Sequence, residues 1–270
     1  MLTETASHLF FSVQRAEWLE FYATFFNLEQ AAQNLTASIN DNYNCFKKAA
    51  SVATTKPLVA WTSYVAPSTY NNNTASWTIS GAPYKVTLTN DAGGSFYNGT
   101  GGVQSFSTSA AFLDSIQAVD IIIDETFTGD NITDFYTSYG LSATSTLKFV
   151  QNKAIFREDG LVNPNDGRDW FAAAVAMDDA VLQDIIRAVH PEVLPANIPY
   201  NWIRNIAKGE TEQLLTSANC TATDSSKPVP DRAIVCKTMK AGGGGRSAAS
   251  KTVAGAMTAV LGLMAIAFSL

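Results

Sequence analysis

Residues 16–50 read AEWLEFYATFFNLEQAAQNLTASINDNYNCFKKAA, and this stretch decides the fold. Apolar or small residues recur along it at intervals of three and four, at Trp18, Phe21, Phe25, Leu28, Ala32, Leu35, Ile39 and Phe46. Because that spacing places side chains on one face of a helix, we expect a long helix that is buried along much of its length. Unbroken, it would span roughly 50 Å. Asn27 followed by Gln30 resembles a capping box, which predicts a break or kink near Asn27.

Two interpretations of this helix stay open at the level of sequence. It is either a core helix of an α/β domain or a spine that joins one lobe at each end. In the second case the residues after it provide one lobe, whereas only residues 1–15 precede it. We therefore expect the lobe before the spine to be missing from this chain.

Composition limits the classes of function. The chain has 270 residues, of which 46% are hydrophobic and 16% charged, so it can bury a sizeable core. A net charge of −6 argues against nucleic-acid binding, because no basic patch can neutralise phosphates. Two histidines and three cysteines without a Cys-x-x-Cys motif argue against a structural zinc site, and no cofactor is predicted.

The C-terminus, AGGGGRSAASKTVAGAMTAVLGLMAIAFSL at 241–270, predicts a lipid anchor. Small residues at 241–245 come first, a spacer of roughly 8–12 residues follows, and an uncharged apolar tail occupies 253–270. This order is typical of a GPI-attachment signal, with attachment expected at Gly243. A plain tail anchor is the alternative. The chain would then be a glycoprotein of the cell surface.

Entry into the secretory pathway is supported by five N-x-S/T sequons, at Asn34, Asn72, Asn98, Asn131 and Asn219. The N-terminal residues MLTETASHLFF lack the basic and apolar regions of a signal peptide. We interpret this conflict as a sequence that starts late, which agrees with the missing lobe.

Strands and helices alternate after the spine, which predicts an α/β domain with a mostly parallel sheet. Residues 77–88 are ambiguous between a strand and a short helix closed by glycine. The other expected elements are a strand at 56–65, a helix at 107–119, a strand at 120–125, a helix at 131–139, a strand, turn and extended piece at 147–157, and a helix at 169–189.

The cysteines lie far apart in the sequence. Cys220 and Cys236 flank a polar loop, and in an oxidising compartment we expect them to pair, which would stabilise by about 3 kcal/mol. Cys45 is then left with a partner in the missing lobe, or as a buried free thiol. The expected domains are a spine with a remnant of the first lobe (1–50), an α/β lobe (51–210), a disulfide-containing stalk (211–252) and the apolar tail (253–270).

A family resemblance rests on short motifs in order: RAEWLEFYATFFNLEQAAQNL, the strand at 56–65, APYKVTLTNDAGG, AAFLDSIQAVDIIIDETF, LKFVQNKAIFREDG and DWFAAAVAMDDAVLQDIIRAVHPE. Together they resemble the second half of periplasmic binding proteins of the helical-spine class, which are siderophore, haem, cobalamin and metal receptors. FFN, YNC, AGG, DET and NKAIFREDG resemble the mostly fungal cell-surface members. The resemblance covers about residues 3–207. It implies a C-terminal lobe, a short helix at 83–94 and a ligand cleft at the carboxyl ends of the strands.

Eight residues are expected to contact a ligand at those strand ends: Trp61, Tyr64, Asp124, Glu125, Arg157, Glu158, Arg168 and Trp170. Aromatic rings suit stacking, and the two arginines suit bidentate binding of carboxylates. The structural alternative is that Trp61 lies in the core and that Arg157 pairs with Glu158 or Asp159.

The resulting function is a non-catalytic, solute-binding module at the cell surface, with a siderophore-like or metal-containing small molecule as ligand. Two other classes stay open. Asp124 or Glu125 opposite Glu158 or Asp159 would give the carboxylate pair that glycoside hydrolysis needs. The second alternative class is a structural or adhesive surface protein that has lost ligand binding. The missing lobe or another chain would cover the spine.

Overall fold

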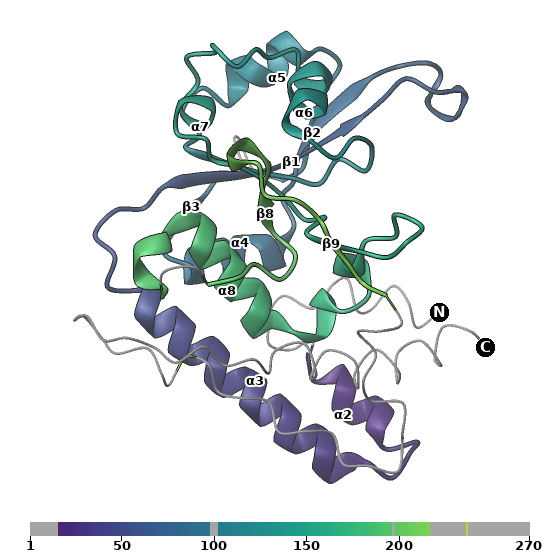
Figure 1. The fold of residues 1–270 in the computed structure, drawn as a ribbon, viewed down its shortest axis with the longest axis vertical. Coiled ribbons are helices and arrows are strands. Elements are labelled where there is room, and N and C mark those ends of the chain that lie inside the picture. Colours follow the sequence, from purple (N-terminus) through teal and green to yellow (C-terminus); the bar gives the residue numbers. More distant parts are fainter. Residues whose placement is uncertain (1–15, 98–101, 196–197, 217–235, 237–270) are drawn as a thin grey trace.

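A seven-stranded sheet forms the centre of the structure, a computed structural model that describes residues 16–97, 102–195, 198–216 and 236 (Figure 1). The strands are ordered β4, β2, β1, β5, β6 and β8, and β3 pairs with β1 off this path. Their bounds are β1 (Leu58–Val65), β2 (Ser76–Ile79), β3 (Ser95–Phe96), β4 (Gln104–Phe106), β5 (Ile121–Asp124), β6 (Ile155–Arg157) and β8 (Arg204–Asn205). A two-stranded sheet pairs β7 (Leu161–Val162) with β9 (Gln213–Leu214).

The sheet is mixed. β1 pairs in parallel with β3 and β5, and β5 pairs in parallel with β6. The β1–β2, β2–β4 and β6–β8 pairings are antiparallel. The expected mostly parallel sheet is therefore parallel at its centre and antiparallel toward its edges. All four residues of β5 are buried because this strand lies between β1 and β6, as its run of isoleucines predicts.

Helices cover both faces of the sheet. Val59 and Trp61 of β1 pack into one layer, while Ala60 between them packs into the other, because successive strand residues point to opposite faces. We call the first layer the spine face; it contains α3 (Glu29–Ala50), α4 (Pro83–Asp91) and α8 (Asp178–Val189). The second layer, the far face, contains α5 (Ser109–Ser115), α6 (Ile132–Tyr139) and α7 (Lys148–Gln151). The two layers lie on opposite sides of the strands in Figure 1.

The expected break in the spine is confirmed. α2 (Trp18–Ala23) is followed by a turn, and α3 begins at Glu29. Asn27 has a φ of 57°, in the left-handed region that asparagine tolerates. The cap of α3 is Leu28, which makes no side-chain capping bond, so the predicted capping box is wrong. The break arises from the backbone of Asn27 instead.

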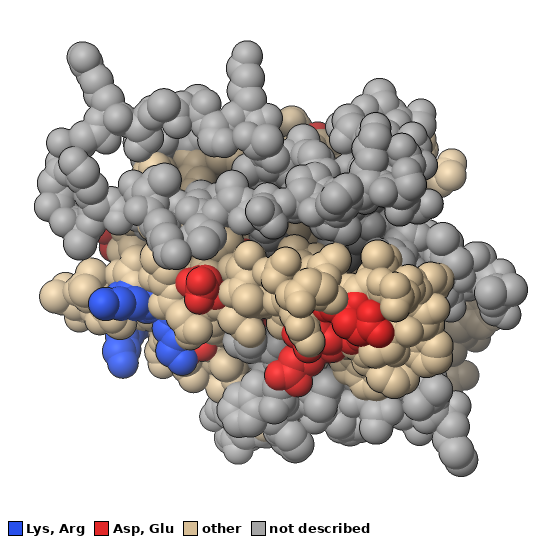
Figure 2. All heavy atoms as spheres, turned by 90° about the horizontal axis from the view of Figure 1, so that it is seen from below, with Lys and Arg blue, Asp and Glu red and all other residues tan. Residues whose placement is uncertain are grey.

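The two parts of the spine are buried to different extents. Ala32, Ile39 and Phe46 of α3 are buried, as the spacing predicts. Around α2, however, Phe21 is 48% exposed and Phe25 is 69% exposed, so the expected burial is wrong there. Lys and Arg side chains gather at one end of the face seen in Figure 2, where Asp and Glu side chains also lie, and further Asp and Glu side chains lie nearer its middle. α3 itself has acidic Glu29 in its first turn and lysines in its last, which suits the helix dipole.

Two stretches differ from their predicted structure. Within 147–157 the first expected strand is α7, and only Ile155–Arg157 is a strand. Phe149 and Val150 are adjacent and both buried, which a helical turn against the sheet permits. The predicted helix at 169–189 begins at Asp178 and is preceded by two 3-10 turns, η3 (Asp169–Phe171) and η4 (Ala174–Ala176). Trp170 of η3 packs between the rings of Trp61 and Trp202, which fixes these turns.

The remaining elements agree with the sequence. β2 ends at Ile79 and α4 begins at Pro83, which resolves the ambiguous segment as a strand followed by the helix that the resemblance implied. α5 and α6 lie within the predicted ranges. Asn131 caps α6 at its start, and Gly140 ends it with a φ of 64°.

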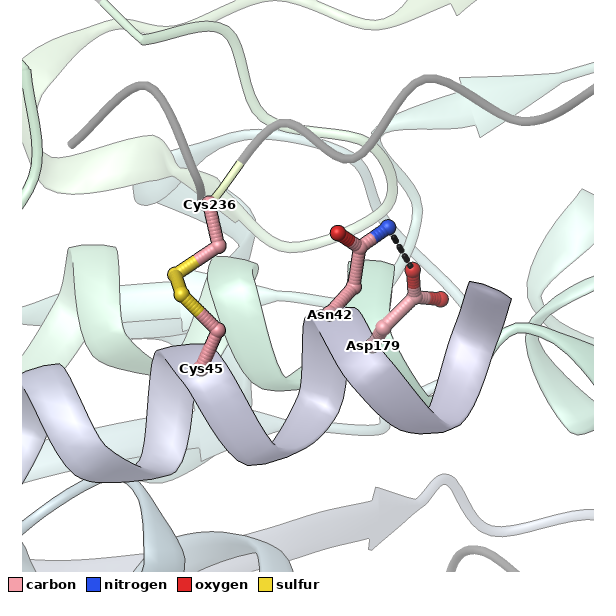
Figure 3. Close-up of a disulfide and its surroundings, with 4 residues drawn as sticks. All are labelled: Asn42, Cys45, Asp179 and Cys236. Atoms are coloured by element: carbon pink, nitrogen blue, oxygen red, sulfur yellow. Dashed lines mark hydrogen bonds between the residues drawn. A yellow bond between two sulfur atoms is a disulfide. The ribbon is translucent and has the colours of Figure 1, made fainter. Parts of the chain in front are cut away.

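The disulfide differs from the predicted one. Cys236 is bonded to Cys45 of α3, with an S–S distance of 2.11 Å and a Cα–Cα distance of 5.8 Å (Figure 3). Cys220 lies outside the described residues, and the expected Cys220–Cys236 bond is wrong because the fold buries Cys236 in the core of the spine face. Closing a loop with a sequence separation of 191 would stabilise by about 5 kcal/mol in the chain-entropy model. With β9 paired to β7, this bond also shows that parts of the expected stalk belong to the folded body.

Several predictions concern the surface or undescribed residues. Asn34, Asn72 and Asn131 are exposed, whereas Asn98 and Asn219 lie outside the described residues; glycosylation of all five stays a prediction. Gly243 and the apolar tail also lie outside them. In the part of the chain that the structure describes, no helix has the length and apolar character needed to cross a membrane.

Candidate functional site

A small pocket of about 120 Å³ opens on the spine face of the sheet, next to the carboxyl end of β5. Its wall residues come from α4, the turn after β5, the two 3-10 turns and α8. They are Tyr84, Leu88, Glu125, Trp170, Phe171, Ala174, Val175, Asp178 and Val181. Of the eight predicted contact residues, the pocket brings Glu125 and Trp170 to its surface. An aromatic wall with few charged groups is typical of small-molecule sites.

Trp170 is held in place by aromatic rings behind it. Its ring centroid lies 6.2 Å from that of Trp61 and 6.4 Å from that of Trp202. Trp61 is fully buried and donates from Nε1 to Thr89 Oγ1 at 3.1 Å. Trp61 therefore lies in the core, as its structural alternative expects, and contact of Trp61 with a ligand stays a prediction. Trp61 supports the residue that reaches the pocket.

Tyr64 lies on the far face. Its ring packs 5.2 Å from Trp77 and 6.3 Å from Tyr139, centroid to centroid. Tyr64 does not line the pocket because strand alternation turns it away from Trp61. The predicted ligand contact of Tyr64 is not at this pocket and stays a prediction.

Asp124, Arg157, Asp159 and Arg204 form what we call the closed cluster. Arg157 is 1% exposed, and each of its three nitrogens donates a hydrogen bond. Nη1 donates to Asp124 Oδ2 and Nε to Asp159 Oδ2, both at 2.8 Å, while Nη2 donates to backbone carbonyls. Arg204 Nε donates to Asp159 Oδ1 at 2.7 Å. Asp124 and Arg157 are thus bonded to each other and do not line the pocket, and their contact with a ligand stays a prediction.

The ionisation of the closed cluster follows from its partners. Burial raises the pKa of the Asp124 carboxyl, although the charge of Arg157 opposes this shift. Burial would also raise the pKa of Asp159, but hydrogen bonds from Arg204 and the charge of Arg157 outweigh it and lower that pKa. The cluster is a satisfied, buried ionic network that joins β5, β6 and β8.

Lys85, Glu125, Glu158 and Arg168 form what we call the open cluster. Lys85 Nζ donates to Glu125 Oε1 at 2.5 Å and lies 5.3 Å from the Trp61 ring centroid. Arg168 Nη2 donates to the carbonyls of Thr126 and Phe127. The remaining contact is loose, since Arg168 Nη1 lies 3.8 Å from Glu158 Oε1. Within the described residues, Glu158 Oε2 and Arg168 Nη1 are buried and have no hydrogen-bond partner.

The two acids of the open cluster have raised pKa values. Burial and the neighbouring carboxylate of Glu125 raise the pKa of Glu158 well above its usual range. Burial likewise raises the pKa of Glu125, against the charge of Lys85. The cluster therefore contains two acids whose pKa values are raised, and one of them, Glu125, lines the pocket. Perturbed carboxyls next to a pocket are a recognised sign of a functional site.

Some of the residues that line the pocket were not predicted from the sequence. Tyr84, Phe171 and Asp178 line the pocket, and Lys85 pairs with its acid. The resemblance implies the helix at 83–94, but it does not indicate which face of that helix points to the strand ends. Phe171 and Asp178 were included in a single long helix, which hides the turns that bring them to the pocket. In the described ranges, no group of three or more His, Cys, Asp and Glu residues could hold a metal ion.

Comparisons with known proteins give structural similarity only. No family model and no curated protein matches the chain. The periplasmic solute binding protein from Veillonella parvula DSM 2008 aligns over 65% of this chain and 49% of its own, at 18% identity and a TM-score of 0.47. The TroA-like periplasmic binding protein FepB from Veillonella parvula aligns over 71% and 61%, at 14% identity and a TM-score of 0.49.

A third solved structure is similar to the same extent. The periplasmic heme-binding protein RhuT from Roseiflexus sp. RS-1 aligns over 66% of this chain and 63% of its own, at 13% identity and a TM-score of 0.46. In each of the three cases, the aligned part spans less than two thirds of the other protein's length.

Proposed function

We propose that this chain is a solute-binding module that holds a small molecule at the strand-end pocket without catalysing a reaction. One observation carries this proposal: an aromatic pocket that contains a carboxylate lies beside buried polar atoms that lack partners. Unsatisfied buried groups are unfavourable in a resting fold, and a ligand or ordered water can satisfy them. The sequence resemblance to siderophore, haem, cobalamin and metal receptors supports a siderophore-like or metal-containing ligand.

The positions of the acids favour binding over glycoside hydrolysis. A hydrolase needs two carboxyls that flank the bond to be cleaved. Of the four acids considered, only Glu125 lines the pocket. Glu158 is 1% exposed behind it, and Asp124 and Asp159 are engaged by arginines. The pairs of acids that the sequence offers for hydrolysis are therefore not brought together in the pocket.

The proposed setting is the cell surface, where a GPI anchor attached at Gly243 would hold the module. This part of the proposal rests on the sequence of the tail and on the sequons. We further propose that a preceding lobe or another chain covers α2. The exposed aromatic rings of Phe21, Tyr22, Phe25 and Phe26 support this cover, because apolar groups gathered in one place mark contact surfaces.

Ligand binding can be tested with two matched phenylalanine variants. The purified chain is screened by thermal shift and calorimetry against ferric siderophores, haem, cobalamin and divalent metals. Phe171 is 63% exposed in the pocket and Phe25 is 69% exposed on the spine, so both Phe→Ala changes should leave folding intact. We expect Phe171→Ala to weaken a hit at least tenfold and Phe25→Ala to leave it unchanged.

Two outcomes would contradict the proposal. A stable chain that responds to none of these compounds would favour a structural or adhesive surface protein. Turnover of a glycan that is lost in Glu125→Gln would favour a hydrolase.

A further inference from the structure

The charged residues in the pocket wall are all acidic. Glu125 and Asp178 are the two charged side chains that line it, and the other wall residues are aromatic or aliphatic. No lysine, arginine or histidine lines the pocket in the described part of the chain. Because the wall has acidic side chains and no basic ones, it favours a positively charged ligand.

The nearest basic groups are held behind the wall. Lys85 is 6% exposed, and its ammonium is bound to Glu125 Oε1 and lies over the Trp61 ring. The head group of Arg168 is turned toward the carbonyls of Thr126 and Phe127. Neither cation is placed to receive a negative group in the pocket.

Asp178, at the start of α8, places a second acid in the pocket wall. An anionic ligand would therefore meet acidic side chains in a wall that offers it no basic one, which is unfavourable. A cation would be attracted by Glu125 and would also interact favourably with the faces of Tyr84 and Trp170.

We propose that the pocket takes a cationic ammonium group carried on a planar or aliphatic body. Glu125 accepts its hydrogen bond, and Trp170, Tyr84 and Phe171 enclose the body of the ligand. This inference rests on the proposed function and names the ligand's charge class. It excludes small carboxylates as preferred ligands of this pocket.

The test uses three probes that share one ring and differ in charge. Tryptamine is cationic, indole is neutral and indole-3-propionate is anionic at pH 7. Binding to the purified full chain is followed by saturation-transfer NMR and calorimetry. We expect tryptamine to bind at least tenfold more tightly than indole-3-propionate. We expect Glu125→Gln to remove that preference, whereas Asp114→Asn, which removes an exposed carboxylate on α5, should keep it.

The alternative results are distinct. Equal binding of all three probes, lost in Phe171→Ala, would overturn the charge preference and leave solute binding standing. Tighter binding of indole-3-propionate would also overturn it. No binding of any probe would overturn the preference, and the screen of metal complexes would then decide the proposed function separately. If Glu125→Gln does not fold, a salt titration of the wild type tests the proposal instead. The preference for tryptamine over indole-3-propionate must then fall as NaCl rises from 0.05 to 0.5 M, because about tenfold more salt screens the charge of the pocket.

Discussion

The closed and open clusters lie side by side at the same strand ends, yet they differ in how completely their charges are satisfied. Arg157 and Glu158 are neighbours in the sequence and are both 1% exposed. Arg157 uses all three of its nitrogens, whereas Glu158 keeps a buried oxygen without a partner among the described residues. Each cluster contains two acidic and two basic side chains, although Glu125 of the open cluster is only partly buried. What distinguishes a structural network from a candidate site here is the unfinished hydrogen bonding.

Strand alternation explains why neighbours divide in this way. In β5, Ile122 packs on the far face and Ile123 on the spine face, so Asp124 and Glu125 continue to the far and spine faces respectively. β6 repeats the pattern with Ile155 and Phe156, followed by Arg157 and Glu158. The far-face pair meets in the closed cluster. The spine-face pair points to the side where the pocket opens.

The largest expected effect comes from breaking the closed cluster with Arg157→Met. The change leaves Asp124 and Asp159 buried without the partner that bridges them, and we expect the free energy of unfolding to fall by about 3–5 kcal/mol. Urea denaturation followed by circular dichroism measures it. Arg168→Met in the open cluster is the matched control and should lose less. Equal losses in the two variants would contradict the distinction between the clusters.

Asp159→Asn should destabilise less and should alter the pH dependence. Removing the charge that two arginines share is expected to lower the free energy of unfolding by about 1.5–3 kcal/mol at pH 7. Because the folded-state pKa of Asp159 is lowered, its contribution is present above the unfolded-state value and is lost as pH falls through the folded-state pKa. Wild type should therefore lose more stability on acidification than the variant. If the free energy of unfolding falls equally with pH in the wild type and in Asp159→Asn, Asp159 is not responsible for the pH dependence.

Glu125→Gln tests the only close ion pair of the open cluster. Gln can still accept from Lys85, but the buried ammonium loses its counter-charge, and we expect a loss of about 1–2 kcal/mol. Thermal and urea unfolding measure it, with Asp114→Asn as the surface control. A loss as large as that of Arg157→Met would show that the open cluster is as structurally important as the closed one.

Glu158→Gln is expected to have the smallest effect, below about 1 kcal/mol, because burial and the neighbouring Glu125 already disfavour the charged form of Glu158. The sign of its pH dependence is opposite to that of Asp159. A raised folded-state pKa gives stability that is present below the unfolded-state value and lost as pH rises through the folded-state pKa. Replacing Glu158 should therefore flatten the alkaline side of the stability profile. A steeper profile would contradict the raised pKa.

The predictability of the fold and of the site differed for physical reasons. Local sequence signals placed β5, α6 and the break at Asn27, because each depends on neighbouring residues. The strand-end rule brought Asp124, Glu125, Arg157 and Glu158 to one edge of the sheet. The division between two faces could also have been inferred, by extending the alternation of each strand by one residue. That step alone would have separated Glu125 from Arg157 as a ligand contact.

Other features depend on contacts that sequence spacing does not reveal. The pairing of Cys45 with Cys236 joins residues that are distant in the chain, whereas spacing favoured the nearer Cys220. The 3-10 turns around Trp170 depend on a stack with Trp61 and Trp202, which come from different elements. The aromatic spacing around α2 is the same as that of a buried helix, so its exposure could be found only from the structure.

The Cys45–Cys236 bond also determines how the chain would carry mechanical load. A pull applied between α2 and any residue beyond Cys236 travels along the spine to Cys45, crosses the two sulfur atoms and leaves at Cys236. Residues 46–235, which include the whole sheet and both clusters, lie inside a closed covalent ring and carry none of this tension. Reduction of the bond opens the ring, and the same pull then acts on β9 and β8 first, at the end of the sheet that completes the closed cluster.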